Sequence, residues 1–320
     1  MHRQLIGLIS ILILLSLSGQ SLAQDDTFPE DNRLLVWLAS GSQPGQQNSQ
    51  TPGEIALMSG DGTTETLLPL DAGQIEHVMS CGNNGWSQNH EHFVFFAGRD
   101  TGGLYMVNQA DRTVQTLETD IANMVCVGDD TLRFSPDSTQ IAYLAYPEDF
   151  LSASTPFGQL IHKTVADAET VTTIEGAGAF ALDNTQLAYT TYSLNNRDEA
   201  DELIVNVLQG GSSTEIASVE AGSNCFFNSS SMVSVNDELI VIAGRLCQVG
   251  NRRSNWRIYR VSPANQTMTL VADDAAVGGY RPTARNNQMW LSPDEARIYF
   301  TIPDGISNNT VSVSMFDLAT

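Results

Sequence analysis

The side chains best suited to ligand binding in this sequence are arginines gathered in its C-terminal part. Eight of the 15 Lys and Arg residues lie between positions 245 and 297, although the chain carries 37 Asp and Glu residues. Guanidinium groups bind carboxylates and phosphates through paired hydrogen bonds, and a tyrosine ring adds a stacking surface. We therefore predict a site for an anionic ligand at Arg252, Arg253, Tyr280, Arg281 and Arg285. The alternative is that these arginines are solvated and paired with Asp273 and Asp274.

Two acidic pairs are the candidates for metal binding. Asp129 and Asp130 form the first pair, and Asp273 and Asp274 form the second. Carboxylates together with backbone carbonyls are ligands that Ca²⁺ prefers, so a structural calcium ion is the one cofactor to consider. Solvated loop acids are the alternative, and we otherwise expect no metal and no cofactor. The His-Glu-His sequence at positions 90–92 lacks the H-E-x-x-H spacing of zinc peptidases.

Catalytic motifs are absent from the sequence. It contains no G-x-S-x-G nucleophile elbow, so we expect no serine hydrolase and assign no catalytic residue. Glycoside hydrolysis by two carboxylates stays open, because a sequence gives no distances between them.

The first 23 residues have the pattern of a signal peptide. A short cationic start precedes an apolar run from Leu5 to Ser18, and small residues follow at Ser21 and Ala23. The run is shorter than the roughly 20 residues of a membrane span. We therefore predict a mature chain of residues 24–320 that is exported to the periplasm, cell surface or exterior, without a membrane span. The formal net charge of −22 argues against nucleic acid as a partner.

One short pattern recurs six times along the mature chain. An apolar residue precedes a turn built on Asp or Asn, and a run of four to six apolar residues follows. The copies begin at Phe28, Trp86, Phe134, Phe180, Val233 and Leu291. Asp, Asn and Pro reverse the chain, and the β-branched and aromatic run after the turn suits a strand. Because this run is apolar without alternation, both of its faces must be buried.

A second pattern of strand, tight polar turn and strand follows each copy, as in residues 102–117. Each module therefore holds four strands, here called A to D in chain order. Modules of this size with doubly buried strands stack radially as blades. We predict an all-β fold, a six-bladed β-propeller of four-stranded antiparallel blades over residues 24–320. The last module stops before its strand D, so we expect an incomplete last blade or a natural chain that extends past Thr320.

The copies at Phe134 (FSPDSTQIAY) and Leu291 (LSPDEARIYF) resemble the WD40-like blades of TolB-like propellers. This resemblance covers nearly the whole mature chain. It implies a periplasmic binding or scaffold protein, or the gating domain of a serine peptidase.

The four cysteines fit this module map. An even number in an exported chain predicts two disulfides, and no C-x-x-C pair points to zinc. Cys81 and Cys126 precede the A strands of neighbouring blades, whereas Cys225 and Cys247 lie at the same end of one hairpin. We predict the pairs Cys81–Cys126 and Cys225–Cys247.

Loop lengths distinguish the two ends of the predicted blades. The A–B and C–D turns are short and form the short-turn face, where the His-Glu-His sequence would lie. The B–C and D–A connections are long and form the long-loop face, where binding sites are commonest. We predict a non-enzymatic binding or scaffold protein that engages a protein, peptide or anionic ligand there. The alternatives are an extracytoplasmic hydrolase with carboxylates or a metal at the channel mouth, and a propeller module of a longer envelope protein.

Overall fold

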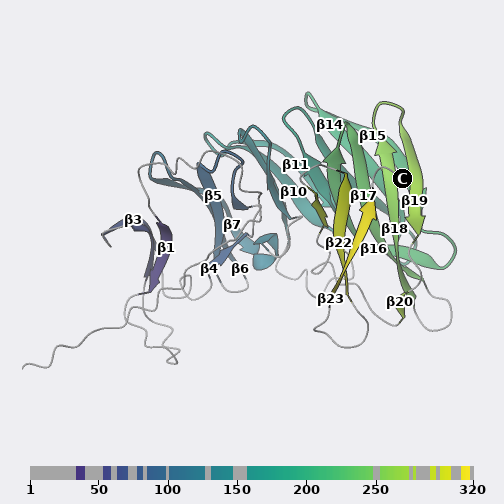
Figure 1. Cartoon of the computed structure of the whole chain (residues 1–320), viewed down its shortest axis with the longest axis horizontal. Helices are drawn as coiled ribbons and strands as arrows, with labels where there is room; N and C mark the ends of the chain where they lie inside the picture. The colour runs from purple at the N-terminus through teal and green to yellow at the C-terminus, as the bar shows by residue number, and fades with distance from the viewer. Residues whose placement is uncertain are drawn as a thin grey trace, which may run out of the picture.

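The computed structural model shows a chain built almost entirely of β-strands (Figure 1). A single-turn 3₁₀ helix, η2, spans Asn123–Cys126. The structure describes residues 34–39, 53–58, 63–70, 78–81, 85–98, 101–126, 131–146, 157–247, 253–273, 277–278, 289–292, 296–303 and 311–317. Within these ranges, no helix is long and apolar enough to cross a membrane.

The strands form antiparallel sheets in which consecutive strands are neighbours. The first sheet holds β1 (Leu34–Ala39), β2 (Gly53–Met58) and β3 (Thr64–Leu70). The next holds β4 (Val78–Ser80), β5 (His92–Gly98), β6 (Thr101–Asn108) and β7 (Thr113–Ala122). It is followed by β8 (Leu132–Phe134), β9 (Gln140–Ala145), β10 (Gly158–Thr164) and β11 (Thr170–Ala177).

Two four-stranded units come next and share one sheet. The first unit holds β12 (Phe180–Leu182), β13 (Leu187–Leu194), β14 (Ala200–Gln209) and β15 (Ser212–Glu220). The second holds β16 (Cys225–Val235), β17 (Glu238–Cys247), β18 (Arg253–Ser262) and β19 (Thr267–Asp273). A single residue pair, Ala200 with Phe227, joins them, and β20 (Val277–Gly278) pairs with the start of β18. The last sheet holds β21 (Met289–Leu291), β22 (Arg297–Pro303) and β23 (Val311–Asp317).

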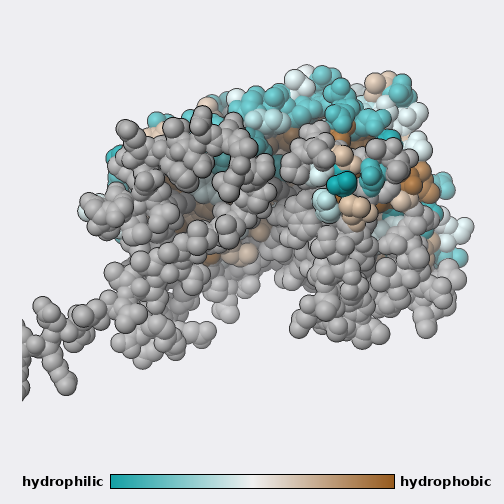
Figure 2. All heavy atoms as spheres, viewed as in Figure 1, coloured by the Kyte–Doolittle hydropathy of each residue, from teal (hydrophilic) through white to brown (hydrophobic). Residues whose placement is uncertain are grey.

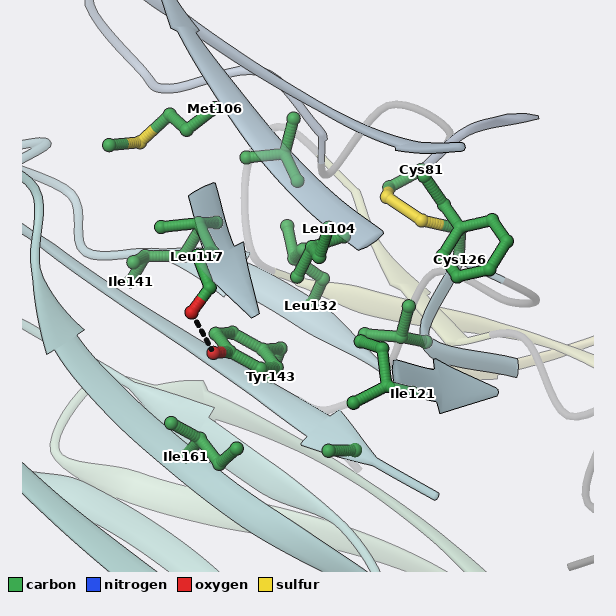
Figure 3. Close-up of a cluster of buried hydrophobic side chains, with 14 of the residues drawn as sticks. Cys81, Leu104, Met106, Leu117, Ile121, Cys126, Leu132, Ile141, Tyr143 and Ile161 are labelled. Carbon is green, nitrogen blue, oxygen red and sulfur yellow. Dashed lines mark hydrogen bonds between the residues drawn. A yellow bond between two sulfur atoms is a disulfide. The ribbon is translucent and has the colours of Figure 1, made fainter. Parts of the chain in front are cut away.

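The hydrophobic core lies between neighbouring sheets. One cluster combines Val94 and Leu104 of the β4–β7 sheet with Ile141 and Tyr143 of β9 (Figure 3). Similar clusters fill the next interfaces along the chain. Strand β9 is buried from Ile141 to Ala145, as its continuous apolarity predicts. Four-stranded antiparallel units stacked through their faces are consistent with a β-propeller.

The ends of the described chain lie apart. In Figure 1, β1 and β3 (purple) stand at one end of the array, and β22 and β23 (yellow) lie beside β16 and β17. The closure of a ring, and with it the six-blade count, stays a prediction. The expected strand A of the first module falls outside the described residues.

The short turns carry the backbone hydrogen bonds that their sequence predicts. Asp137 accepts from the backbone N–H of Thr139 at 3.1 Å, and the buried Ser135 receives the N–H of Gln140 at 3.0 Å. Neighbouring turns are also linked, because the Asp137 N–H donates to the side-chain oxygen of Asn184 at 2.9 Å. Figure 2 shows hydrophilic residues along this edge, which is the upper edge of the view.

Both predicted disulfides are present. Cys81–Cys126 ties the end of β4 to η2, and Cys225–Cys247 joins two residues that face each other across β16 and β17. Two disulfides are typical of an oxidising, extracytoplasmic environment.

Candidate functional site

A polar pocket of about 370 Å³ opens between the β12–β15 and β16–β19 units. One wall is the B–C loop from β13 to β14, and the other is the D–A connection from β15 to β16. The pocket therefore lies at the end of the blades that the sequence predicts to form the long-loop face. Its main lining side chains are Asn195, Arg197, Glu199, Asp201, Asn224 and Phe226.

The B–C wall is shaped by the side chain of Asn195. Its Oδ1 accepts the backbone N–H groups of Arg197 at 2.8 Å and Glu199 at 3.2 Å. Its Nδ2 donates to Oε2 of Glu199 at 3.2 Å, which fixes the position of that carboxylate. Asn is favoured in such a turn because its side chain bonds backbone groups two or more residues ahead.

Asp201 is placed by an irregularity at the start of β14. The pairing of β13 with β14 shifts from Ser193–Glu202 to Leu194–Ala200, so Asp201 is the extra residue of a β-bulge. A bulge turns a side chain out of the regular alternation, and such features are frequent beside functional sites. The bulge puts a second carboxylate two residues from Glu199 in the same pocket.

The opposite wall is a tight turn. Gly222 has a φ of +93°, a left-handed conformation that favours glycine, and its carbonyl accepts the N–H of Cys225 at 3.1 Å. Asn224 adopts a φ of +58°, which asparagine tolerates better than most residues. The disulfide at Cys225 then ties this wall to the end of β17.

The chemistry of the pocket suits a ligand with many hydroxyl groups. Three amides, two carboxylates and a guanidinium supply donors and acceptors, whereas Phe226 is the one aromatic side chain among the lining residues. Pockets for hydrophobic ligands are mostly apolar, whereas most of the side chains that line this one are polar or charged.

Most residues of the predicted anion site are not among those that line this pocket or that the structure describes. Arg252, Tyr280, Arg281 and Arg285 lie outside the described residues, as do Asp129, Asp130 and Asp274. Arg253 opens β18 and Asp273 closes β19, so their backbones lie at the same end of the blade as the pocket. The anion and calcium sites therefore stay predictions.

His90 and Glu91 lie in the A–B turn, as predicted, and His92 is the first residue of β5. His90 is exposed, and His92 is buried, which lowers the pKa of its imidazole. In the part of the chain that the structure describes, no three His, Cys, Asp or Glu side chains meet as metal ligands.

Sequence reasoning missed every residue of this pocket. The signal that could have found it is the polar run from Asn195 to Asp201, which carries three acids and an arginine between two apolar strands. The opposite wall could not have been assigned, because its glycine and asparagine resemble those of any loop.

These features define a protein with β-propeller-like blades and a polar pocket between two of them. No protein-family model matches the sequence, and no curated protein matches it significantly. Several solved structures are similar. An oligogalacturonate lyase in complex with manganese aligns with a TM-score of 0.47 and 12% identity, over 88% of this chain and 73% of the lyase. The β-propeller domain of the Trilobed protease from Pyrococcus furiosus aligns with a TM-score of 0.47 and 7% identity, over 89% of this chain and 78% of that domain.

The acylaminoacyl peptidase of Pyrococcus horikoshii aligns with a TM-score of 0.46 and 8% identity, over 90% of this chain and 43% of the peptidase. This chain therefore spans less than half of that enzyme. The prediction of a non-enzymatic binding or scaffold protein is contradicted by these comparisons, because the similar structures are enzymes or parts of enzymes. At this level of similarity, none of their substrates is assigned to this chain.

Proposed function

We propose that this chain is an exported, six-bladed propeller of TolB-like type that hydrolyses a saccharide in the pocket between the β12–β15 and β16–β19 units. The observation that carries the proposal is the meeting of Glu199 and Asp201 in one polar pocket. Glycoside hydrolysis uses two carboxylates, one as acid and the other as base or nucleophile. Only Ala200 separates the two residues in the sequence, and both of them line the pocket, so one sugar linkage bound there would face both carboxylates.

The surroundings of the two carboxylates support a saccharide as the substrate. The amides of Asn196 and Asn224 and the guanidinium of Arg197 are matched to hydroxyl groups, and the Phe226 ring offers a face for sugar C–H groups. The predicted signal peptide and the two disulfides support a reaction outside the cytoplasm.

The test uses the mature chain, residues 24–320, with oligosaccharides of glucose, N-acetylglucosamine and galacturonate. Release of reducing ends measures hydrolysis, and calorimetry measures binding. We expect Glu199→Gln and Asp201→Asn to lower kcat at least about 100-fold, the loss typical of removing an acid or base. Asp237→Asn is the matched control, because Asp237 is an exposed carboxylate in the β16–β17 turn of the short-turn face.

The outcomes separate the proposal from its rivals. Hydrolysis that is lost in both pocket variants and kept in the control supports it. Binding without hydrolysis would reduce the chain to the substrate-binding part of an enzyme. Neither binding nor hydrolysis of any of the three saccharide classes would overturn the proposal.

A further inference from the structure

A charged side chain is buried directly behind the pocket. Arg245 lies on β17 and is only 6% exposed, next to the D–A wall. A guanidinium is costly to bury unless its N–H groups are hydrogen-bonded. Nη1 of Arg245 donates to the carbonyl oxygen of Ala221 at 2.5 Å. Ala221 lies in the connection from β15 to β16.

The peptide groups on either side of Ala221 are thereby held from two directions. The N–H of Ala221 donates to the carbonyl oxygen of Asp201 at 2.7 Å, while its carbonyl accepts from Arg245. Asp201 is the bulged residue whose carboxylate lines the pocket. A continuous chain of hydrogen bonds therefore runs from Arg245 through Ala221 to Asp201.

Strand β17 anchors the D–A wall at two points. Arg245 holds Ala221 at its beginning, and Cys247 holds Cys225 at its end through the disulfide. Residues two apart on a strand point to the same face, so both anchors project toward this wall. The residues between them include Gly222 and Asn224, which line the pocket.

We propose that Arg245 is a positioning residue for the pocket: it fixes the wall formed by residues 221–225 and, through Ala221, the backbone of Asp201. The effect on saccharide binding rests on the function proposed above. A buried hydrogen-bonded guanidinium is suited to this task because its planar fork holds a fixed direction, which a lysine ammonium on a flexible stem does not.

The experiment compares Arg245→Met and Arg245→Lys with the wild-type mature chain. Lys163→Met is the matched control, because Lys163 is also a buried cation, 8% exposed, but lies on β10. Amide hydrogen exchange of residues 221–225 is measured relative to that of β9, which corrects for any change in global stability. Saccharide affinity is measured on the same proteins.

We expect Arg245→Met to accelerate exchange in residues 221–225 about tenfold and to weaken saccharide binding about tenfold, whereas Arg245→Lys recovers part of both. Lys163→Met should leave both readouts at the wild-type value. Should Arg245→Met fail to fold, Arg245→Lys carries the test with a smaller increase in exchange.

Unchanged exchange in residues 221–225 of the Arg245 variants would overturn the inference, whatever the affinity. Absence of saccharide binding by the wild-type protein would instead overturn the proposed function, while the exchange ratio still decides the role of Arg245. Faster exchange with unchanged affinity would show a structural role only, and would overturn the positioning role.

Discussion

Two interfaces between neighbouring sheets are built from the same module but filled in different ways. Between the β4–β7 and β8–β11 sheets, large apolar side chains such as Leu104, Leu132 and Ile141 pack with Tyr143 (Figure 3). Between the β12–β15 and β16–β19 units, many positions are alanine, and hydroxyl groups meet in the space. Tyr192 shares a hydrogen bond with Ser230 at 2.6 Å, and Thr190 contacts the same Ser230 oxygen at 3.0 Å.

The difference separates scaffold from site. Large apolar side chains fill the first interface, so its contribution is stability. In the second interface, small residues and hydroxyl groups let the polar backbone and side chains of the two units approach each other. The pocket opens at one end of this interface. A polar interface must keep every hydrogen bond satisfied, so its residues should be less replaceable by apolar ones.

Tyr143→Ala should produce the largest loss of stability, because it empties the centre of the apolar interface. Tyr143 is fully buried, and we expect a loss of about 3–5 kcal/mol in the free energy of unfolding. Denaturant unfolding measures it. Tyr143→Phe is the control and should lose far less, since the hydroxyl makes only long contacts of 3.4 Å to Leu117 and Glu118. Equal losses in the two variants would show that packing is not what holds this interface.

Removing the disulfides should have the next largest effect. Cys81 and Cys126 are 45 residues apart, tie the end of β4 to η2 and belong to the apolar interface, so replacing both by serine should cost about 3–4 kcal/mol. Cys225 and Cys247 are 22 residues apart, and the shorter loop predicts a loss about 0.6 kcal/mol smaller. Thermal unfolding of the two double variants measures the difference. A larger loss for the second pair would indicate that the pocket wall contributes more to stability than the apolar interface does.

Ser230→Ala should test the polar interface. The change removes the hydrogen bonds that Ser230 shares with Tyr192 and Thr190, and the loss of such a bond costs about 1 kcal/mol. Denaturant unfolding again measures it, with Ser218→Ala on the exposed strand β15 as the control. No loss would mean that the hydroxyl cluster is dispensable and that the contrast between the interfaces is one of size alone.

Alkaline pH should weaken the polar interface through Tyr192. Burial raises the pKa of Tyr192 from 10.0 to about 12. Between pH 10 and 12 the unfolded state therefore loses this proton and the folded state keeps it, so stability falls as the pH rises through this window. The measurement is the melting temperature from pH 8 to 11, which should fall less steeply for Tyr192→Phe than for the wild-type chain. Parallel curves would contradict the assignment.

Acid should produce the smallest effect, through His162 on β10. Burial lowers the pKa of His162 from 6.5, and its Nε2 lies 2.8 Å from the amide oxygen of Gln140. The unfolded state binds the proton more readily, so stability should decline as the pH falls below 6.5. His162→Gln should flatten the decline of the melting temperature between pH 7 and 5. An unchanged slope would mean that other groups cause this decline.

The sequence predicts the strands well because the same pattern of Asp or Asn turn and apolar run recurs in each module. The hairpins expected at Phe134, Phe180, Val233 and Leu291 coincide with β8–β9, β12–β13, β16–β17 and β21–β22. Asx turns and continuous apolar runs are local patterns, so the structure that they predict does not depend on contacts between modules. The disulfides were predictable for the same reason, since the module map alone brings each pair together.

The pocket was not predictable because it depends on contacts between modules. Asp201 reaches it through a bulge, and Arg245 reaches its wall from the next unit, neither of which a strand pattern reveals. The search for chemistry favoured the arginines of residues 252–285 because they stand out in an acidic chain. Amides and acids in an acidic chain gave no such contrast.

The most direct test of the account is a hydrogen-exchange footprint of the mature chain with the oligosaccharide that it binds most tightly. The account predicts that bound sugar slows exchange in residues 195–201 and 221–226 and leaves the β4–β7 and β8–β11 sheets unchanged. Protection confined to other loops, with these two segments exchanging as fast as in the free protein, would contradict it.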